Sequence, residues 1–135
     1  MLTFEEFSVF CQNYGLSAFE EARKIDEKSY LQMQIADYVL NNNDRHEQNW
    51  GFLVENSSGK IIGYVPLFDH DHAFSEYENL MSQTREETIS LQEAAIQAQN
   101  ILQMDLHKVY EMEKPELLSE KQWQSVLDRI EKLMR

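Results

Sequence analysis

The sequence is poor in cysteine, glycine, proline and cations: it has one Cys, four Gly, two Pro and twelve Lys or Arg among 135 residues. A single cysteine, Cys11, cannot form an internal disulfide, which predicts a reducing compartment. No stretch approaches the roughly 20 apolar residues of a membrane span, and the first residues lack the basic start of a signal peptide. We therefore expect a soluble, cytoplasmic protein.

The shortage of cations leaves the chain strongly acidic. Against 12 Lys and Arg stand 24 Asp and Glu, which gives a net charge of -12. Such a surface repels nucleic acids and anionic membranes, so we expect neither as a direct partner. It also repels a free nucleoside triphosphate, so ATP would have to arrive with a cation or with help from another chain. The length fits one domain, residues 1–135, with one modest core.

The first third of the chain carries helix-start signals. The spacing of a capping box begins at Thr3 and again at Ser17, and Asp26 is expected to cap a third, longer helix. The apolar stripe expected on that third helix consists of Leu31, Ile35, Tyr38 and Val39. The asparagine run 41–43 is expected to end it, because Asn side chains compete for backbone hydrogen bonds.

The middle of the chain has a strand pattern. Residues 51–55 and 60–65 are rich in β-forming side chains, and residues 56–59 between them have the composition of a turn. Pro66 is expected to close the second strand, because it cannot donate a hydrogen bond to a ladder. The pattern predicts an antiparallel hairpin over residues 51–65, followed by a loop from 67 to 88.

The last third is again helical in pattern. Helices are expected to begin at Ser90 and Ser119, with a short helix after Asp105 and a break at Pro115. The side chains expected to face inward are Leu91, Ala94, Ala95, Ala98, Ile101, Leu102, Leu106, Val109, Tyr110, Trp123, Val126, Leu127, Ile130, Leu133 and Met134. The sequence therefore predicts a mainly α fold with one small antiparallel β-hairpin.

Polar residues of one chemical type gather at the two ends of this hairpin. Asp44-Arg-His-Glu-Gln-Asn49 precedes it, and Asp69 follows it. In phosphoryl transfer an aspartate accepts or orients the proton of the attacking hydroxyl, and an asparagine oxygen binds a divalent cation. Mg²⁺ prefers such hard oxygen ligands and keeps several waters. Because a hairpin brings its outer ends together, Asn49 and Asp69 are expected to be neighbours.

These residues carry a family resemblance. Asp44-Arg-His-x-x-Asn49 is similar to the catalytic loop of phosphoinositide kinases. The wider pattern N-x-D-R-H-x-x-N-x-G, a hairpin and then Pro-Leu-Phe-Asp69 resembles the HipA-type serine/threonine kinases, which are toxin–antitoxin and related bacterial kinases. The resemblance implies a protein-kinase-like C-lobe that uses Mg²⁺ and ATP to phosphorylate a protein Ser or Thr. It implies Asp44 as the catalytic aspartate, His46 as a structural or hydrogen-bonding member of the catalytic loop, and Asn49 and Asp69 as ligands of Mg²⁺·ATP.

The sequence departs from that family's pattern at two positions and lacks one lobe. Gln48 stands where HipA-type loops often carry Lys, and His70 follows Asp69 in place of Gly. A kinase N-lobe needs a glycine-rich loop over the phosphates and a Lys, and residues 1–43 are too few to supply them. We therefore expect the chain to be a fragment, half of a split kinase or a degenerate remnant. It would be inactive unless an N-lobe is supplied in cis or in trans.

Other interpretations remain open. Asp69-His-Asp-His72 together with His46 could bind Zn²⁺ or Mn²⁺ in a metal-dependent phosphohydrolase, although alternating residues of an extended segment point to opposite faces. The roles of His70, Asp71 and His72 stay unassigned. A C-lobe without its N-lobe could also be a non-catalytic protein-interaction module, because it would expose apolar surface. Finally, Asp44 and Asn49 could simply cap a turn.

Overall fold

The computed structural model describes residues 1–42, 44–65 and 73–135. Over these residues the fold is mainly helical with a small three-stranded antiparallel sheet, which confirms the predicted mainly α fold. In chain order the elements are β1 (Leu2–Thr3), α1 (Phe4–Asn13), α2 (Ala18–Ile25), α3 (Glu27–Val39), β2 (Gly51–Val54), β3 (Ile61–Tyr64), α4 (Leu91–Leu102), the 3₁₀-helix η1 (Leu106–Glu111) and α5 (Glu120–Met134).

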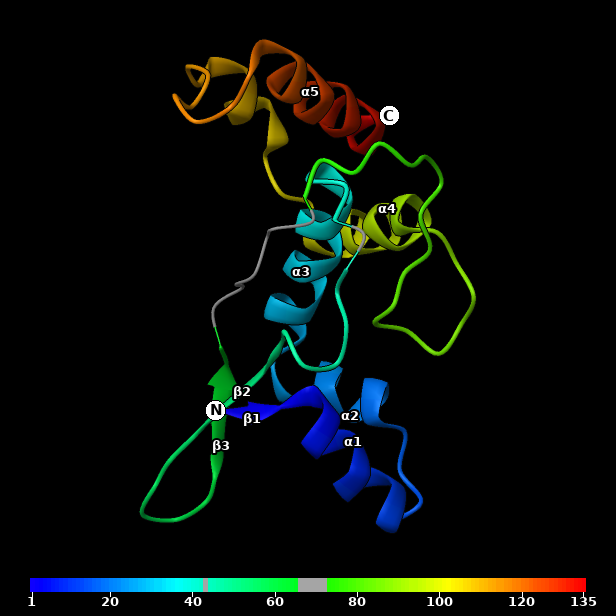
Figure 1. The fold of residues 1–135 in the computed structure, drawn as a ribbon, viewed down its shortest axis with the longest axis vertical. Helices are drawn as coiled ribbons and strands as arrows, with labels where there is room; N and C mark the ends of the chain where they lie inside the picture. Colours follow the sequence, from blue (N-terminus) through cyan, green and yellow to red (C-terminus); the bar gives the residue numbers. More distant parts are fainter. Residues whose placement is uncertain (43, 66–72) are drawn as a thin grey trace.

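Helix α3 forms the centre of the molecule (Figure 1). The sheet, α1 and α2 lie toward one end of the long axis, and α5 lies at the other end, with α4 beside α3. The helices α3 and α4 form the most extensive contact between two elements. After α3 the chain turns back toward the sheet (Figure 1). The motif of residues 44–49, which precedes β2, therefore connects the far end of α3 to the hairpin.

The predicted helix starts are confirmed. Thr3 with Glu6 and Ser119 with Gln122 form complete capping boxes. The other three predicted caps each accept a hydrogen bond from the backbone N–H three residues later; they are Ser17, Asp26 and Ser90. Each cap satisfies one of the N–H groups that a helix leaves unpaired in its first turn.

The predicted hairpin is confirmed as β2 and β3, and the structure adds a strand that the sequence analysis did not predict. Strand β1 pairs with β2, with Leu2 opposite Phe52 and Thr3 opposite Gly51. The rings of Phe4, at the start of α1, and Trp50, directly before β2, are stacked with centroids 4.2 Å apart. This ring pair joins the start of α1 to the strand that follows residues 44–49.

Most of the expected helix faces are buried, but two expected core residues are not. Ile101 is 52% exposed and Tyr110 is 43% exposed, so both predictions were wrong. Ile101 lies at the edge of the stripe that α4 turns toward α3, where helical geometry carries it toward solvent. Tyr110 contacts α5 from the molecular surface, where its hydroxyl donates to the Leu127 carbonyl at 3.3 Å.

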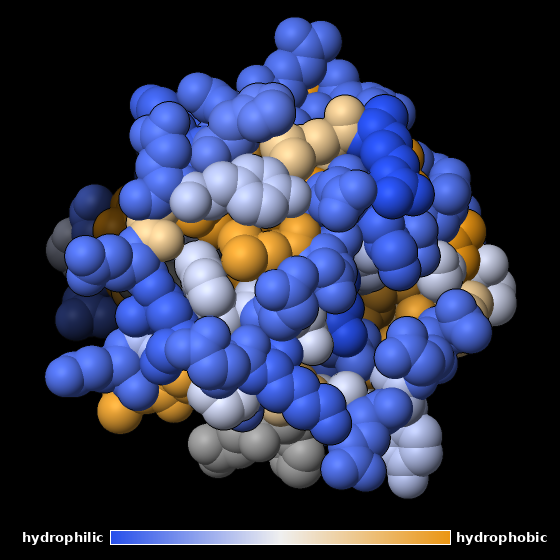
Figure 2. Space-filling view, turned by 90° about the horizontal axis from the view of Figure 1, so that it is seen from above, coloured by the Kyte–Doolittle hydropathy of each residue, from blue (hydrophilic) through white to orange (hydrophobic). Residues whose placement is uncertain are grey.

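The surface seen from the α5 end of the molecule is largely hydrophilic (Figure 2). Hydrophobic residues show on this face only in small separated areas. No helix in the described residues is both long enough and apolar enough to cross a membrane.

Gly51 is expected to be intolerant of any side chain. A Cβ at this position would lie 2.2 Å from the Leu2 carbonyl oxygen and 2.9 Å from the Thr3 Cα. Because both are backbone atoms, they cannot rotate away, so Gly51→Ala should push β1 off β2. We expect a loss of about 1–3 kcal/mol in the free energy of unfolding, which urea denaturation would measure.

The control for Gly51→Ala is Gly15→Ala. Gly15 has φ +66°, but a Cβ there would meet no atom within 4 Å. This substitution therefore costs only the left-handed backbone conformation, roughly 1–2 kcal/mol, and leaves β1 paired. Preserved contacts between Leu2 and Phe52 in the Gly51→Ala variant, seen by NMR, would contradict the prediction.

Candidate catalytic loop

A buried ion pair fixes the predicted catalytic loop to the end of α3. The guanidinium of Arg45 contacts the carboxylate of Asp37 through Nη2–Oδ1 at 2.9 Å and Nε–Oδ2 at 3.1 Å. The two side chains are only 2% and 3% exposed. A buried pair of this kind needs further hydrogen bonds to offset the cost of removing both charges from water.

Those further hydrogen bonds run along both halves of the loop. The Asn42 side-chain amide donates to Asp37 Oδ1 at 3.2 Å, and its oxygen accepts from the Asp44 N–H at 3.1 Å. Arg45 Nη1 donates to the Asn49 carbonyl at 3.1 Å. The Asp37 carboxylate is therefore the common anchor for the start and the end of the loop.

The sequence analysis assigned no role to Asp37 or Arg45. A signal for Asp37 was present, since a carboxylate in the last turn of a helix is disfavoured by the helix dipole and needs a partner. The predicted apolar stripe of this helix did not include Asp37, so its burial was not predicted. The identity of the partner depended on the path of the loop, which residue types alone do not give.

Asp44 is held by its backbone and presents its carboxylate toward solvent. Its N–H donates to Asn42, and its carbonyl accepts from the Asn49 side-chain amide at 2.5 Å. The Asp44 side chain is 39% exposed, and its Oδ2 lies 3.8 Å from Nε2 of His46. A carboxylate fixed at the backbone and open to solvent is accessible to a hydroxyl group of another molecule.

His46 is oriented by its own loop. Its Nδ1 accepts a hydrogen bond from the Gln48 N–H at 3.1 Å. An accepting Nδ1 leaves the proton of the neutral imidazole on Nε2, the nitrogen that faces Asp44. At 3.8 Å this contact is too long for a hydrogen bond. The expected role of His46 as a structural or hydrogen-bonding member of the loop stays a prediction.

Asn49 is buried and has one polar atom that is not satisfied. The residue is 2% exposed; its backbone N–H donates to the His46 carbonyl, and its Nδ2 donates to the Asp44 carbonyl. Its Oδ1 is buried without a hydrogen-bond partner among the described residues. Leaving a buried acceptor unpaired costs about 1–3 kcal/mol, so such atoms are rare in folded proteins.

The loop is also fastened to the first turn of α1. The N–H groups of Phe4 and Glu5 donate to the carbonyls of Trp50 and Glu47, both at 2.9 Å. Gln48, at the position where HipA-type loops often have Lys, donates to the Glu5 carboxylate at 2.8 Å. The N–H groups that the helix start cannot pair internally thus hold the loop to α1.

The second half of the predicted metal site falls in the part of the chain that the structure does not describe. Asp69, His70, Asp71 and His72 lie outside the described residues. The expected proximity of Asn49 and Asp69 therefore stays a prediction. Among the residues that are described, no three His, Cys, Asp or Glu side chains are grouped to hold a metal ion.

The chain on either side of residues 66–72 is anchored next to the loop. The Val65 N–H donates to the Gly51 carbonyl at 3.0 Å, beside the end of the loop. The Phe74 N–H donates to the Leu40 carbonyl at 2.5 Å, beside its beginning. Val65 and Phe74 thus each bond to a backbone carbonyl that lies close in sequence to one end of the loop.

Comparison with known proteins finds no family model, no curated protein and no solved structure that matches this chain. The family resemblance consequently rests on the motif residues themselves. Of these, the structure brings Asp44, His46 and Asn49 together in one loop that is fixed from two sides.

Proposed function

We propose that this chain is the C-lobe-like part of a HipA-type phosphotransferase that transfers phosphate from Mg²⁺·ATP to a protein Ser or Thr hydroxyl. The observation that carries the proposal is the Oδ1 of Asn49, which is buried and has no hydrogen-bond partner in the part of the chain that the structure describes. This is the atom that the resemblance assigns to the divalent cation, and an amide oxygen is a ligand type that Mg²⁺ accepts.

Each loop residue has a role in this proposal. Asp44 orients the attacking hydroxyl and accepts its proton, which its solvent-facing carboxylate permits. Asn49, with Asp69 as the second ligand, holds the Mg²⁺, which when bound neutralises charge on the nucleotide phosphates. The pair formed by Asp37 and Arg45 positions the loop without contacting substrate.

The proposal includes a second lobe, supplied in cis or in trans. The only cation of the loop, Arg45, is buried against Asp37 and engaged with the Asn49 carbonyl, so it is not available for phosphates. The net charge of -12 also opposes nucleotide binding by this chain alone. An N-lobe with a Lys and a glycine-rich loop would supply the missing positive groups.

Paramagnetic Mn²⁺ tests the metal site directly, because it takes the same oxygen ligands as Mg²⁺ and broadens nearby NMR signals. We expect low Mn²⁺ concentrations to broaden the side-chain amide signal of Asn49 first. An excess of Mg²⁺ should restore that signal. The Asp69→Asn variant should need about tenfold more Mn²⁺, because it loses a charged ligand.

The acidic surface makes a control necessary, since Mn²⁺ also binds exposed carboxylates. Glu76→Gln removes one such carboxylate close in sequence to the segment that follows the hairpin and should leave the broadening of Asn49 unchanged. Broadening that is uniform over the protein, or equal in Asp69→Asn and the parent, would refute the metal site.

A second candidate function is the non-catalytic interaction module. It is favoured by two exposed apolar side chains on the hairpin, Leu53 at 44% and Ile62 at 61% exposure. Strand β3 also lies at the edge of the sheet, where another chain could add a strand. A failure of Mn²⁺ to reach Asn49 would favour this function over the kinase.

A further inference from the structure

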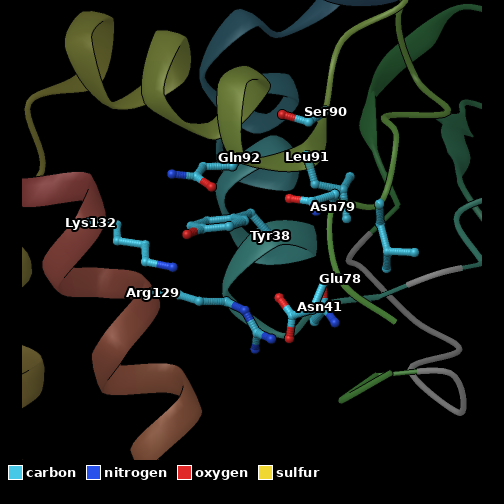
Figure 3. Close-up of a pocket in the computed structure, with 10 residues that line it drawn as sticks. Tyr38, Asn41, Glu78, Asn79, Ser90, Leu91, Gln92, Arg129 and Lys132 are labelled. Atoms are coloured by element: carbon cyan, nitrogen blue, oxygen red, sulfur yellow. The ribbon is translucent and has the colours of Figure 1, made fainter. Parts of the chain in front are cut away.

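A small pocket lies away from the catalytic loop, between the end of α3, the start of α4 and the outer helix α5 (Figure 3). Its volume is about 70 Å³. The residues that carry the argument are Tyr38 from α3, Glu78 from the loop before α4, Gln92 from α4, and Arg129 and Lys132 from α5. The phosphotransferase function proposed above does not use this pocket.

Two cations of α5 face the pocket. Arg129 and Lys132 are three residues apart, which places them on one side of the helix. Arg129 Nη1 donates to the Val39 carbonyl at 3.4 Å, and among the described residues its other N–H donors have no hydrogen-bond partner. Lys132 has no ion pair among the described residues. In a chain with net charge -12, two cations on one small pocket are a local reversal of sign.

The N-terminus of α4 lines the same pocket. In its first turn the Leu91 N–H donates to the Leu80 carbonyl, and the Glu93 N–H donates to the cap Ser90 at 3.0 Å. The Gln92 N–H has no intrahelical acceptor, as is general for this position. The helix dipole adds a partial positive charge at this end of a twelve-residue helix.

The hydroxyl of Tyr38 is an independent indication of a ligand. Tyr38 is 6% exposed, and its hydroxyl is buried without a hydrogen-bond partner among the described residues. Figure 3 shows this hydroxyl pointing to the side of the pocket where Lys132 and Gln92 lie. Burial raises the pKa of Tyr38, so the phenol stays protonated at neutral pH and can donate a hydrogen bond.

We propose that this pocket binds the phosphate group of a ligand. A buried O–H donor, two cations and a helix N-terminus line this pocket from three elements, with the Arg129 guanidinium toward Asn41 and Glu78 and the Tyr38 hydroxyl toward Lys132, which suits an anion with several acceptor oxygens (Figure 3). Glu78 also lines the pocket and opposes anion binding, so the ionisable lining residues, two cations and one carboxylate, leave a charge of +1. The same chemistry is offered by free inorganic phosphate and by the phosphate of a phosphorylated side chain.

The test is an NMR titration with inorganic phosphate at constant ionic strength, and a second with O-phosphoserine. We expect saturable shifts of the Leu91 and Gln92 amide signals. Tyr38→Phe and Lys132→Gln should each weaken phosphate binding about tenfold, because each removes one hydrogen-bond donor to a charged ligand. Glu78→Gln should strengthen it. Tighter binding of O-phosphoserine would identify a phosphorylated side chain as the source, and tighter binding of inorganic phosphate would identify the free ion.

Arg135→Gln is the matched control, because it removes a cation from the same helix outside this pocket. Its phosphate affinity should match that of the parent, and circular dichroism should show every variant folded. The proposal is overturned if phosphate causes no saturable shift. It is also overturned if Tyr38→Phe binds as tightly as the parent, or if Arg135→Gln weakens binding as much as Lys132→Gln.

Discussion

Replacement of Asp37 by Leu is expected to lower the free energy of unfolding by about 3–5 kcal/mol, because it leaves the Arg45 guanidinium buried without its counterion. The two side chains are 3% and 2% exposed, so solvent cannot compensate for the lost carboxylate. The same substitution removes the acceptor of the Asn42 amide. Urea unfolding followed by circular dichroism would measure the loss.

Two further variants show whether the effect comes from the unpaired charge. The double variant Asp37→Leu/Arg45→Met should recover a large part of the loss, because no charge remains buried. Glu131→Gln breaks an exposed pair with Arg135 and should cost less than about 1 kcal/mol. A single Asp37→Leu variant as stable as Glu131→Gln would show that the buried pair does not hold the loop.

Replacement of Asp44 by Ala is expected to reduce phosphate transfer by about 10²–10⁴-fold once the second lobe is supplied, because the hydroxyl loses the group that accepts its proton. The hydrogen bonds that fix Asp44 in the loop are made by its backbone, so the fold should remain intact. Transfer of labelled phosphate from ATP to a protein substrate would measure the change.

Glu47→Ala is the control for Asp44→Ala. Glu47 is an exposed carboxylate in the same loop, and its link to α1 is made by its backbone carbonyl. Transfer by this variant should be close to that of the parent. If Asp44→Ala transfers phosphate as fast as Glu47→Ala, Asp44 is not the catalytic aspartate.

The sequence was sufficient for features that depend on neighbouring residues. The five helix caps at Thr3, Ser17, Asp26, Ser90 and Ser119 each involve a hydrogen bond to the third residue along, which spacing reveals. The hairpin likewise depends on two β-rich stretches and a short turn between them.

Features that depend on distant partners were missed. Strand β1 is two residues long and has no pattern of its own; it exists because it pairs with Phe52 and Gly51. Ile101 continues an apolar stripe, but the stripe does not show how wide a face α3 will cover. Local periodicity thus predicts which side of a helix faces inward and leaves its edges undecided.

The same distinction applies to the candidate site. The motif predicted Asp44, His46 and Asn49 as one group, and the structure places them in one loop. The motif did not predict that Asp37 in the preceding helix would anchor both halves of that loop. Asp69 lies outside the described residues, so its part in the metal site stays a prediction.

The hydrogen bonds from the first turn of α1 to the loop have a practical consequence. The amide protons of Phe4 and Glu5 are bonded to carbonyls of Trp50 and Glu47, so they can exchange with deuterium only when the loop separates from α1. Their exchange rates therefore report how often the loop opens, in the absence of nucleotide, metal or substrate.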